Sequence, residues 1–162
     1  MKQLLTAVVF LLISTALVAQ SNTATTTQTG DENDAILTQT GLSNEAEAGQ
    51  FGNLNDATLS QNGNGNIALA DQLHGDENTA NISQLGSTNE AYLVQGMVED
   101  YYSIYGITTT NMISNNNTGA AIQEGSGNLV DFLQVGNNNN GTITQIGNNN
   151  KGYAYQGWAG DW

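Results

Sequence analysis

The chain repeats side-chain amides at a fixed spacing, with an Asn followed by a Gln six positions later. An amide both donates and accepts hydrogen bonds, so identical amides stacked at the strand spacing of about 4.8 Å can bond along a continuous row. We therefore predict structural ladders. The ladder residues are Asn33, Gln39, Asn44, Gln50, Asn55, Gln61, Asn66, Gln72, Asn78, Gln84, Asn89, Gln95, Asn117, Gln123, Asn128, Gln134, Asn139, Gln145, Asn150 and Gln156.

The period of these amides indicates a stacked array. Asn22 and Gln28 keep the same spacing, and successive Gln residues are 11 positions apart except for a step of 12 before Gln84 and a step of 28 before Gln123. A fixed short period is typical of repeat architectures. Stacking also explains inward amides, because a buried amide without a partner costs about 1–3 kcal/mol.

Catalytic and metal-binding patterns are not found. His74 is the only His, and the acidic pairs Asp31–Glu32 and Asp76–Glu77 fall in predicted turns, where we expect solvent exposure. Weak calcium binding by these turns is the alternative, since carboxylates and carbonyls suit a hard cation. The Gly-Gly-x-Gly-x-Asp repeat of calcium-binding β-rolls is absent, however. We predict no enzyme activity, no cofactor and no metal site.

The elements that must position the amides are short strands. In each repeat the first seven residues alternate, so that Asn33, Ala35, Leu37 and Gln39 share one face. Residues of the opposite face, such as Glu45, vary and are expected to contact solvent. Apolar residues at i and i+2 exclude an amphipathic helix.

Each predicted turn carries a Gly two places after the Gln, where a tight reversal with positive φ favours glycine. The repeat around Gln72 has one additional residue in its turn, within Leu73–Gly75, which explains the step of 12. The turn glycines are Gly41, Gly52, Gly63, Gly86, Gly125, Gly136 and Gly147.

Two 11-residue units form one rung, which predicts an all-β fold, a β-solenoid with 22-residue rungs and two facing parallel sheets. Inward Leu37 and Leu59 alternate with Ala48 and Ala70, although Leu93 breaks this series. One unit buries too little to fold alone, so its neighbours must stabilise it. Open strand edges at both ends are a template for another copy of the chain.

The predicted organisation has five parts. Residues 1–19 resemble a secretory signal, with Lys2, an apolar run and Ala19 at the cleavage point. A membrane anchor is the alternative, since a span needs about 20 apolar residues. Repeats occupy 20–95 and 117–156, and 96–116 is an irregular Tyr-rich insert or a degenerate rung. Residues 157–162 form a tail with Trp158 and Trp162, whose role stays open.

The charge of the chain excludes some partners. The formal net charge is −13, and Lys151 is the only Lys or Arg after residue 2. A strongly acidic surface repels nucleic acid and anionic lipid. We expect neither as a partner, and no membrane span in the mature form.

These repeats resemble the curlin family, the subunits of curli amyloid fibres on bacterial surfaces. The family motif is matched by Asn33–Gln39–Gly41–Asn44–Gln50 and by Asn128–Gln134–Gly136–Asn139–Gln145. The resemblance implies a secreted subunit of a Gram-negative-type bacterium that leaves through an outer-membrane channel with accessory proteins. It also implies assembly into cell-surface fibres for adhesion and biofilm matrix, with a minor subunit as nucleator.

Two functional questions remain open at this point. Regular repeats at both ends favour the major fibre subunit over the minor nucleator. A soluble β-solenoid that binds a surface or a carbohydrate is the alternative function. Such a protein would present a flat array of one residue type, whereas the outward positions here vary.

Overall fold

A computed structural model describes residues 21–96 and 114–157, which form strands and turns. The expected signal at 1–19, most of the Tyr-rich segment, and Trp158 and Trp162 lie outside these described residues. The strands are β1 (Thr23–Thr29), β2 (Asp34–Thr40), β3 (Glu45–Phe51), β4 (Asp56–Asn64), β5 (Ile67–Gln72), β6 (Thr79–Ser87), β7 (Glu90–Gln95), β8 (Thr118–Ser126), β9 (Leu129–Gln134), β10 (Asn140–Ile146) and β11 (Lys151–Gln156).

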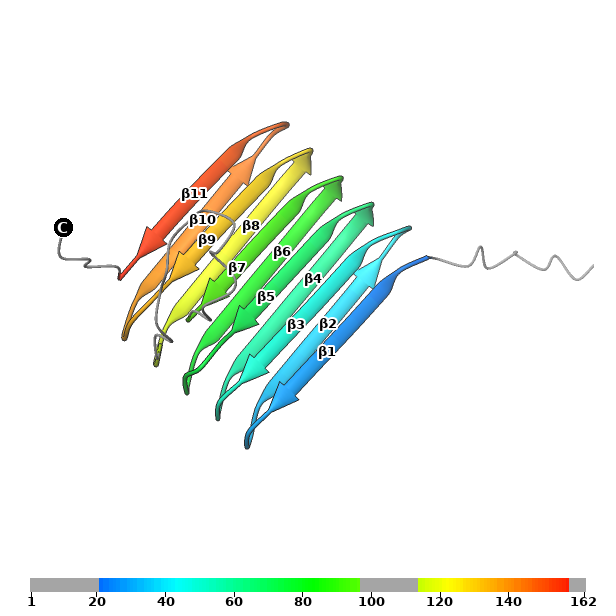
Figure 1. Cartoon of the computed structure of the whole chain (residues 1–162). Coiled ribbons are helices and arrows are strands. Elements are labelled where there is room, and N and C mark those ends of the chain that lie inside the picture. The colour runs from blue at the N-terminus through cyan, green and yellow to red at the C-terminus, as the bar shows by residue number, and fades with distance from the viewer. Residues whose placement is uncertain (1–20, 97–113, 158–162) are drawn as a thin grey trace, which may run out of the picture.

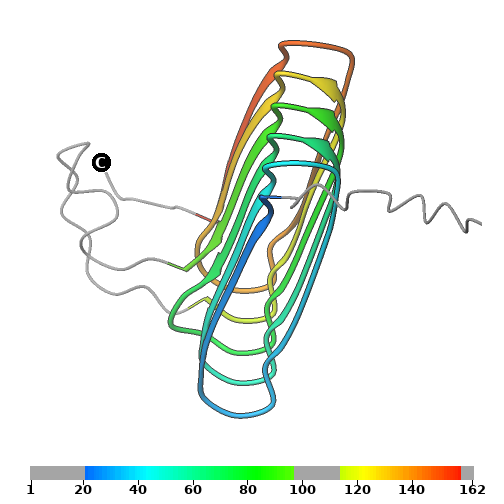
Figure 2. The same ribbon diagram turned by 90° about the vertical axis from the view of Figure 1, so that its right-hand side faces the viewer.

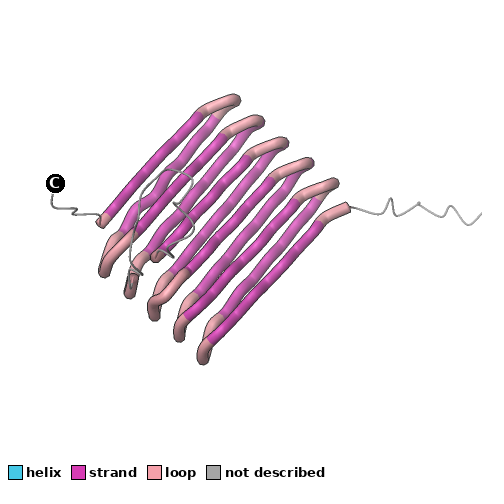
Figure 3. Tube along the Cα trace, in the orientation of Figure 1, coloured by secondary structure: helices cyan, strands magenta, loops and turns pink. Residues whose placement is uncertain are grey.

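Two parallel sheets face each other, and the chain passes from one to the other at every turn (Figures 1 and 2). Sheet A holds the odd-numbered strands in the order β1-β3-β5-β7-β9-β11, and sheet B holds the even-numbered strands in the order β2-β4-β6-β8-β10. Short connections join the strands at both strand ends (Figure 3). The predicted all-β solenoid with rungs of about 22 residues is confirmed.

Every strand pairs with the strand two repeats away, and the Gln of one is always opposite the Gln of the other. The register is kept across the irregular steps, because Gln61 pairs with Gln84 and Gln84 with Gln123. β8 therefore pairs directly with β6, although paired residues of these strands are 39 positions apart in the sequence. The additional residues fall between β5 and β6 and between β7 and β8 in the sequence, outside the strands that pair.

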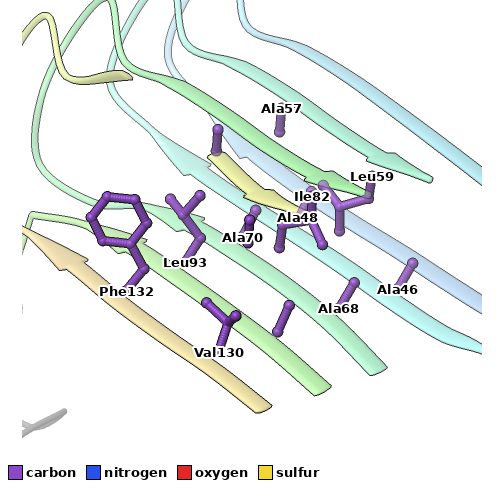
Figure 4. Packing of buried hydrophobic residues seen from close by; sticks show 13 residues of the cluster. Ala46, Ala48, Ala57, Leu59, Ala68, Ala70, Ile82, Leu93, Val130 and Phe132 are labelled. Carbon is purple, nitrogen blue, oxygen red and sulfur yellow. The ribbon is translucent and has the colours of Figure 1, made fainter. Parts of the chain in front are cut away.

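The core is a narrow layer between the sheets, filled mainly by alanine and a few larger side chains (Figure 4). Strands such as β4 alternate exposed and buried residues, as their sequence predicts. Leu93 and Phe132 are the large side chains of sheet A, and both are fully buried. Sheet B has Gly119 opposite Leu93, and a Cβ there would lie 3.0 Å from Leu93 Cδ1. Small residues in the facing sheet thus explain why Leu93 can break the size alternation.

Each turn contains two positions with positive φ. Positive φ favours glycine at the first of these positions, and lack of space is a second reason for glycine there. A Cβ on Gly63, at φ 140°, would overlap the carbonyl oxygen of Gly86 in the next rung. The residue just before the ladder Asn adopts the left-handed conformation, as in Ser43 (φ 55°) and Leu54 (φ 56°). This second position was not predicted, because its residue type varies along the chain.

Candidate functional site

The glutamines form a continuous ladder inside the solenoid. Gln39 Nε2 donates to Gln61 Oε1 at 2.9 Å, and Gln61 Nε2 donates to Gln84 Oε1 at 2.9 Å. The equivalent bonds in both sheets are 2.8–3.1 Å long, including those across the irregular steps. All run in one direction, from the Nε2 of one rung to the Oε1 of the next rung toward the C-terminus.

The same glutamine amides also join the two sheets. Gln61 Nε2 donates to the carbonyl oxygen of Glu45 at 2.8 Å, and Gln50 Nε2 donates to the carbonyl oxygen of Asp34 at 2.8 Å. Each acceptor is at or near the first residue of the preceding strand, which belongs to the facing sheet. Every ladder Gln from Gln39 to Gln156 makes such a bond. Stacking along the axis was predicted, whereas this bond across the core was not.

The asparagines form a second pair of ladders where each strand begins. The backbone N–H of Asn66 donates to Asn44 Oδ1 at 3.0 Å, and Asn44 Nδ2 donates to the carbonyl oxygen of Gly63 at 2.8 Å. The same pattern repeats from Asn22 to Asn150. One amide thus binds the next rung and fixes a turn carbonyl, which explains why Asn precedes each strand.

Most of the predicted ladder amides are buried, and the end rungs account for the rest. Buried members are Asn44, Gln50, Asn55, Gln61, Asn66, Gln72, Asn78, Gln84, Asn89, Gln95, Asn117, Gln123, Asn128, Gln134 and Gln145. Members with more exposure are Asn33, Gln39, Asn139, Asn150 and Gln156. These five lie on the strands or turns at the two ends of the described solenoid.

A further row of polar side chains runs along the turns and was missed by sequence reasoning. Asn53 Oδ1 accepts from the backbone N–H of Asp31 at 2.8 Å, and Asp76 Oδ1 accepts from the N–H of Asn53 at 2.7 Å. The other turn has the same contact, where the N–H of Leu42 donates to Asn64 Oδ1. The signal was present in the sequence, because Asn or Asp often follows the turn glycine directly.

The seven predicted turn glycines all have positive φ, between 88° for Gly136 and 140° for Gly52 and Gly63. The turn after Gln72 differs, because His74 takes a φ of 53° there and is exposed. Leu73 of this longer turn packs with Val94, Leu133 and Val135 in a small buried cluster apart from the main core. His74 thus lies on the surface, as expected of a turn residue.

Comparison with known families identifies these repeats. The curlin associated repeat matches residues 19–52, 52–86, 75–96 and 115–147, which together make up more than half of the chain. The chain belongs to the curlin family. No curated protein and no solved structure matches it. The family and the β-solenoid fold point to a structural protein rather than an enzyme.

Among residues 21–96 and 114–157, the side chains whose pKa departs from its ordinary value lie on the outer face of sheet A. Burial, and to a smaller extent the nearby carboxylate of Glu47, raise the pKa of Asp71 to about 6. Burial also raises the pKa of Asp131, and a hydrogen bond from the Tyr155 hydroxyl at 3.4 Å opposes this effect. Asp71 lies on β5 and Asp131 on β9, with β7 between these two strands in sheet A.

Acidic residues do not gather into a cation site within residues 21–96 and 114–157, where no group of three or more His, Cys, Asp or Glu side chains is suitably arranged. The acidic turns Asp31–Glu32 and Asp76–Glu77 are exposed. Over the same residues, no helix has the length and apolar character to cross a membrane. The notable chemistry of the described curlin repeats is therefore amide hydrogen bonding.

Proposed function

We propose that this curlin is the secreted major subunit of an extracellular fibre that grows by end-to-end strand pairing and serves adhesion and biofilm matrix. The observation that carries the proposal is the pairing at the two ends. In the described solenoid, β1 and β2 each have one hydrogen-bonded neighbour in their sheet, and so do β10 and β11. Such edges template pairing with another chain.

The amide ladders give the two ends complementary chemistry. At the N-terminal end the Oε1 atoms of Gln28 and Gln39 face outward, because inner glutamines accept from the preceding rung there. At the C-terminal end the Oε1 atoms of Gln145 and Gln156 accept from the preceding rung, so their Nε2 groups are the ladder donors that face a next rung. Donors at one end therefore meet acceptors at the other. An interface between unlike ends that does not close produces a filament.

Membership of the curlin family is what supports export and seeding in this proposal. The curlin resemblance supports passage through an outer-membrane channel with accessory proteins, and nucleation by a minor subunit. The acidic surface supports a secreted chain that resists premature association, because net charge keeps chains apart. Each copy that adds to a fibre end supplies the missing neighbour of the terminal rung.

Electron microscopy of the purified secreted form, incubated alone, tests this function. We expect unbranched fibres that bind amyloid dyes. Raising the ionic strength from about 0.01 M to 0.15 M shortens the screening length from about 30 Å to about 8 Å and should shorten the lag before assembly. A chain that stays monomeric for days at the higher salt contradicts the proposal.

A further inference from the structure

The two sheets end at different heights because the number of strands is odd. Between residues 21 and 157 the structure describes eleven strands, six in sheet A and five in sheet B. At the C-terminal end β11 completes only half a rung beyond β10. At the N-terminal end β1 of sheet A begins half a rung before β2 of sheet B. The next copy must fit this step.

We propose that successive subunits exchange sheets, so that β1 of the next copy pairs with β10 and β2 of the next copy pairs with β11. The second copy is then turned by about half a turn around the solenoid axis relative to the first. Its strands continue the chain path as a twelfth and a thirteenth strand would. This proposal rests on the end-to-end assembly proposed above and names the contact that makes it.

The alternative arrangement keeps each sheet continuous, with β1 of the next copy on β11. Because β2 follows β1 by half a rung, it would then lie two strand spacings, about 10 Å, from β10. One whole strand would be missing from sheet B at every junction. The edge of β10 would keep its backbone groups unpaired beside a gap, which is costly when such groups lose water. Exchange of the sheets fills that position.

The charges at the two ends agree with sheet exchange. Gln39 of the next copy stacks on Gln156 in this register, which places Asp34 of the next copy directly opposite Lys151. Lys151 is the only Lys or Arg after residue 2, and both it and Asp34 are exposed. Opposite charges directly across paired strands are stabilising. With continuous sheets, Lys151 would instead be opposite Thr23.

The apolar residues at the two ends also match. Ile36 and Tyr153 are exposed large hydrophobic side chains, at 53% and 57% of their surface, on β2 and β11. Sheet exchange places Ile36 of the next copy directly opposite Tyr153. An aromatic ring beside a β-branched side chain is a favourable cross-strand pair. Continuous sheets would place Thr25 opposite Tyr153 and leave Ile36 beside the gap next to β10, with no strand directly opposite it on that side.

The amide ladders continue through the proposed junction. Gln145 can donate to Gln28 of the next copy, and Gln156 can donate to Gln39 of the next copy. Gln39 follows Gln28 by 11 positions, as Gln156 follows Gln145, so a single position of the next copy continues both ladders. The repeats are equivalent at each site, since Gln opposes Gln in every strand pair within the chain. A half-turn therefore changes which sheet a repeat joins without interrupting the glutamine ladders.

Paired cysteines distinguish the two arrangements, because the chain has no Cys. In the proposed register Thr25 of the next copy is opposite Thr142, and with continuous sheets it is opposite Tyr153. Neighbouring strands are about 4.8 Å apart, within the Cα separation that a disulfide spans. Within one chain these positions lie on opposite end strands, so any disulfide joins two copies.

We expect fibres of the variant T25C with T142C, assembled and then oxidised, to give a ladder of linked multimers on a non-reducing denaturing gel. The variant T25C with Y153C should give no ladder. The single variant T25C is the control, and can form at most dimers. A ladder from T25C with Y153C overturns sheet exchange. Fibres of both double variants without any ladder also overturn it and leave the proposed function intact. Failure of the unmodified chain to form fibres overturns the proposed function instead.

A charge exchange gives a second measurement that does not depend on disulfide formation. We expect D34K to raise the protein concentration left in solution at equilibrium with fibres by about two- to fivefold, as like charges then oppose each other at each junction. The double variant D34K with K151D should return this concentration toward that of the unmodified chain. No rescue by K151D contradicts the proposed pairing, since Lys151 would then not face Asp34.

Discussion

Phe132 of sheet A lies directly against Gly141 of sheet B. Phe132 is fully buried, and a Cβ added to Gly141 would lie 2.6 Å from Phe132 Cζ. The missing side chain of one residue therefore makes room for the ring of the other. This pair shows that the two sheets share one thin core, in which the size of each inward residue limits its neighbours across the layer.

Gly141→Ala should destabilise the solenoid by about 1–3 kcal/mol, because an added methyl group overpacks the core against the Phe132 ring. The double variant Gly141→Ala with Phe132→Leu should lose less stability than the two single variants lose together. The difference, which is the coupling free energy between the two positions, should be at least about 0.5 kcal/mol. Denaturant midpoints of the assembled protein measure both effects. Thr142→Ala on the exposed face is the control, and additive losses would show that the two residues do not share the space.

The glutamine ladder can be tested by removing two of its members. Gln39→Ala with Gln61→Ala deletes bonds along the axis and across the core, and leaves buried partners unsatisfied at about 1–3 kcal/mol each. Elongation of seeded fibres should slow strongly. Thr38→Ala with Ser60→Ala alters the adjacent outward positions of the same strands and should have little effect. Equal rates for the two variants would show that the inward amides do not support assembly.

Two glycines of one turn should respond very differently to alanine. At Gly63 a Cβ would overlap the carbonyl oxygen of Gly86, so Gly63→Ala should cost more than about 4 kcal/mol or prevent folding. At Gly65 the nearest atom to a Cβ is Thr88 Cγ2 at 3.7 Å, and φ is 64°. Gly65→Ala should therefore reduce stability only by the energy that alanine needs to adopt the left-handed conformation, about 1 kcal/mol. Circular dichroism and denaturant titration compare the two, and similar losses would refute the close approach of the rungs.

The raised pKa of Asp71 predicts that the stability of the folded chain depends on pH. Its pKa is raised from 3.8 to about 6 in the folded chain, mainly by burial and then by Glu47. The folded state therefore binds this proton more tightly than the unfolded chain, and stability falls as the pH rises from 3.8 through about 6. Asp71→Asn should increase stability at pH 7, by on the order of 2 kcal/mol, and weaken this pH dependence.

Asp56→Asn is the matched control for Asp71→Asn, because Asp56 is an exposed outward residue of a neighbouring repeat. Its replacement removes the same charge from an exposed site, which separates the effect of burial at Asp71 from that of the net charge. Denaturant midpoints between pH 4 and 7 measure the difference. A profile that is the same for Asp71→Asn and the unmodified chain would show that Asp71 ionises freely in the folded state.

The local features of this curlin could be predicted from its sequence because they depend on residues close together in the chain. The alternation of residues such as Ala35 and Leu37 predicts the strands and their inward face, and the recurring Gly predicts the turns. The Gln and Asn period predicts the stacked register. Each of these signals repeats every 11 residues, so one irregular repeat does not hide it.

Other features were decided by contacts between different rungs or sheets. The fit of Phe132 against Gly141 and the raised pKa of Asp71 depend on which residues meet across the core or on the outer face. The bond from Gln61 to the Glu45 carbonyl depends on the distance between the sheets, which the small residues set. The strands, turns and inward positions of one rung depend on neighbouring residues in the chain, so the repeating sequence determines them. The contacts of each side chain with other rungs and with the facing sheet depend on residues far apart in the chain, so only the tertiary structure determines them.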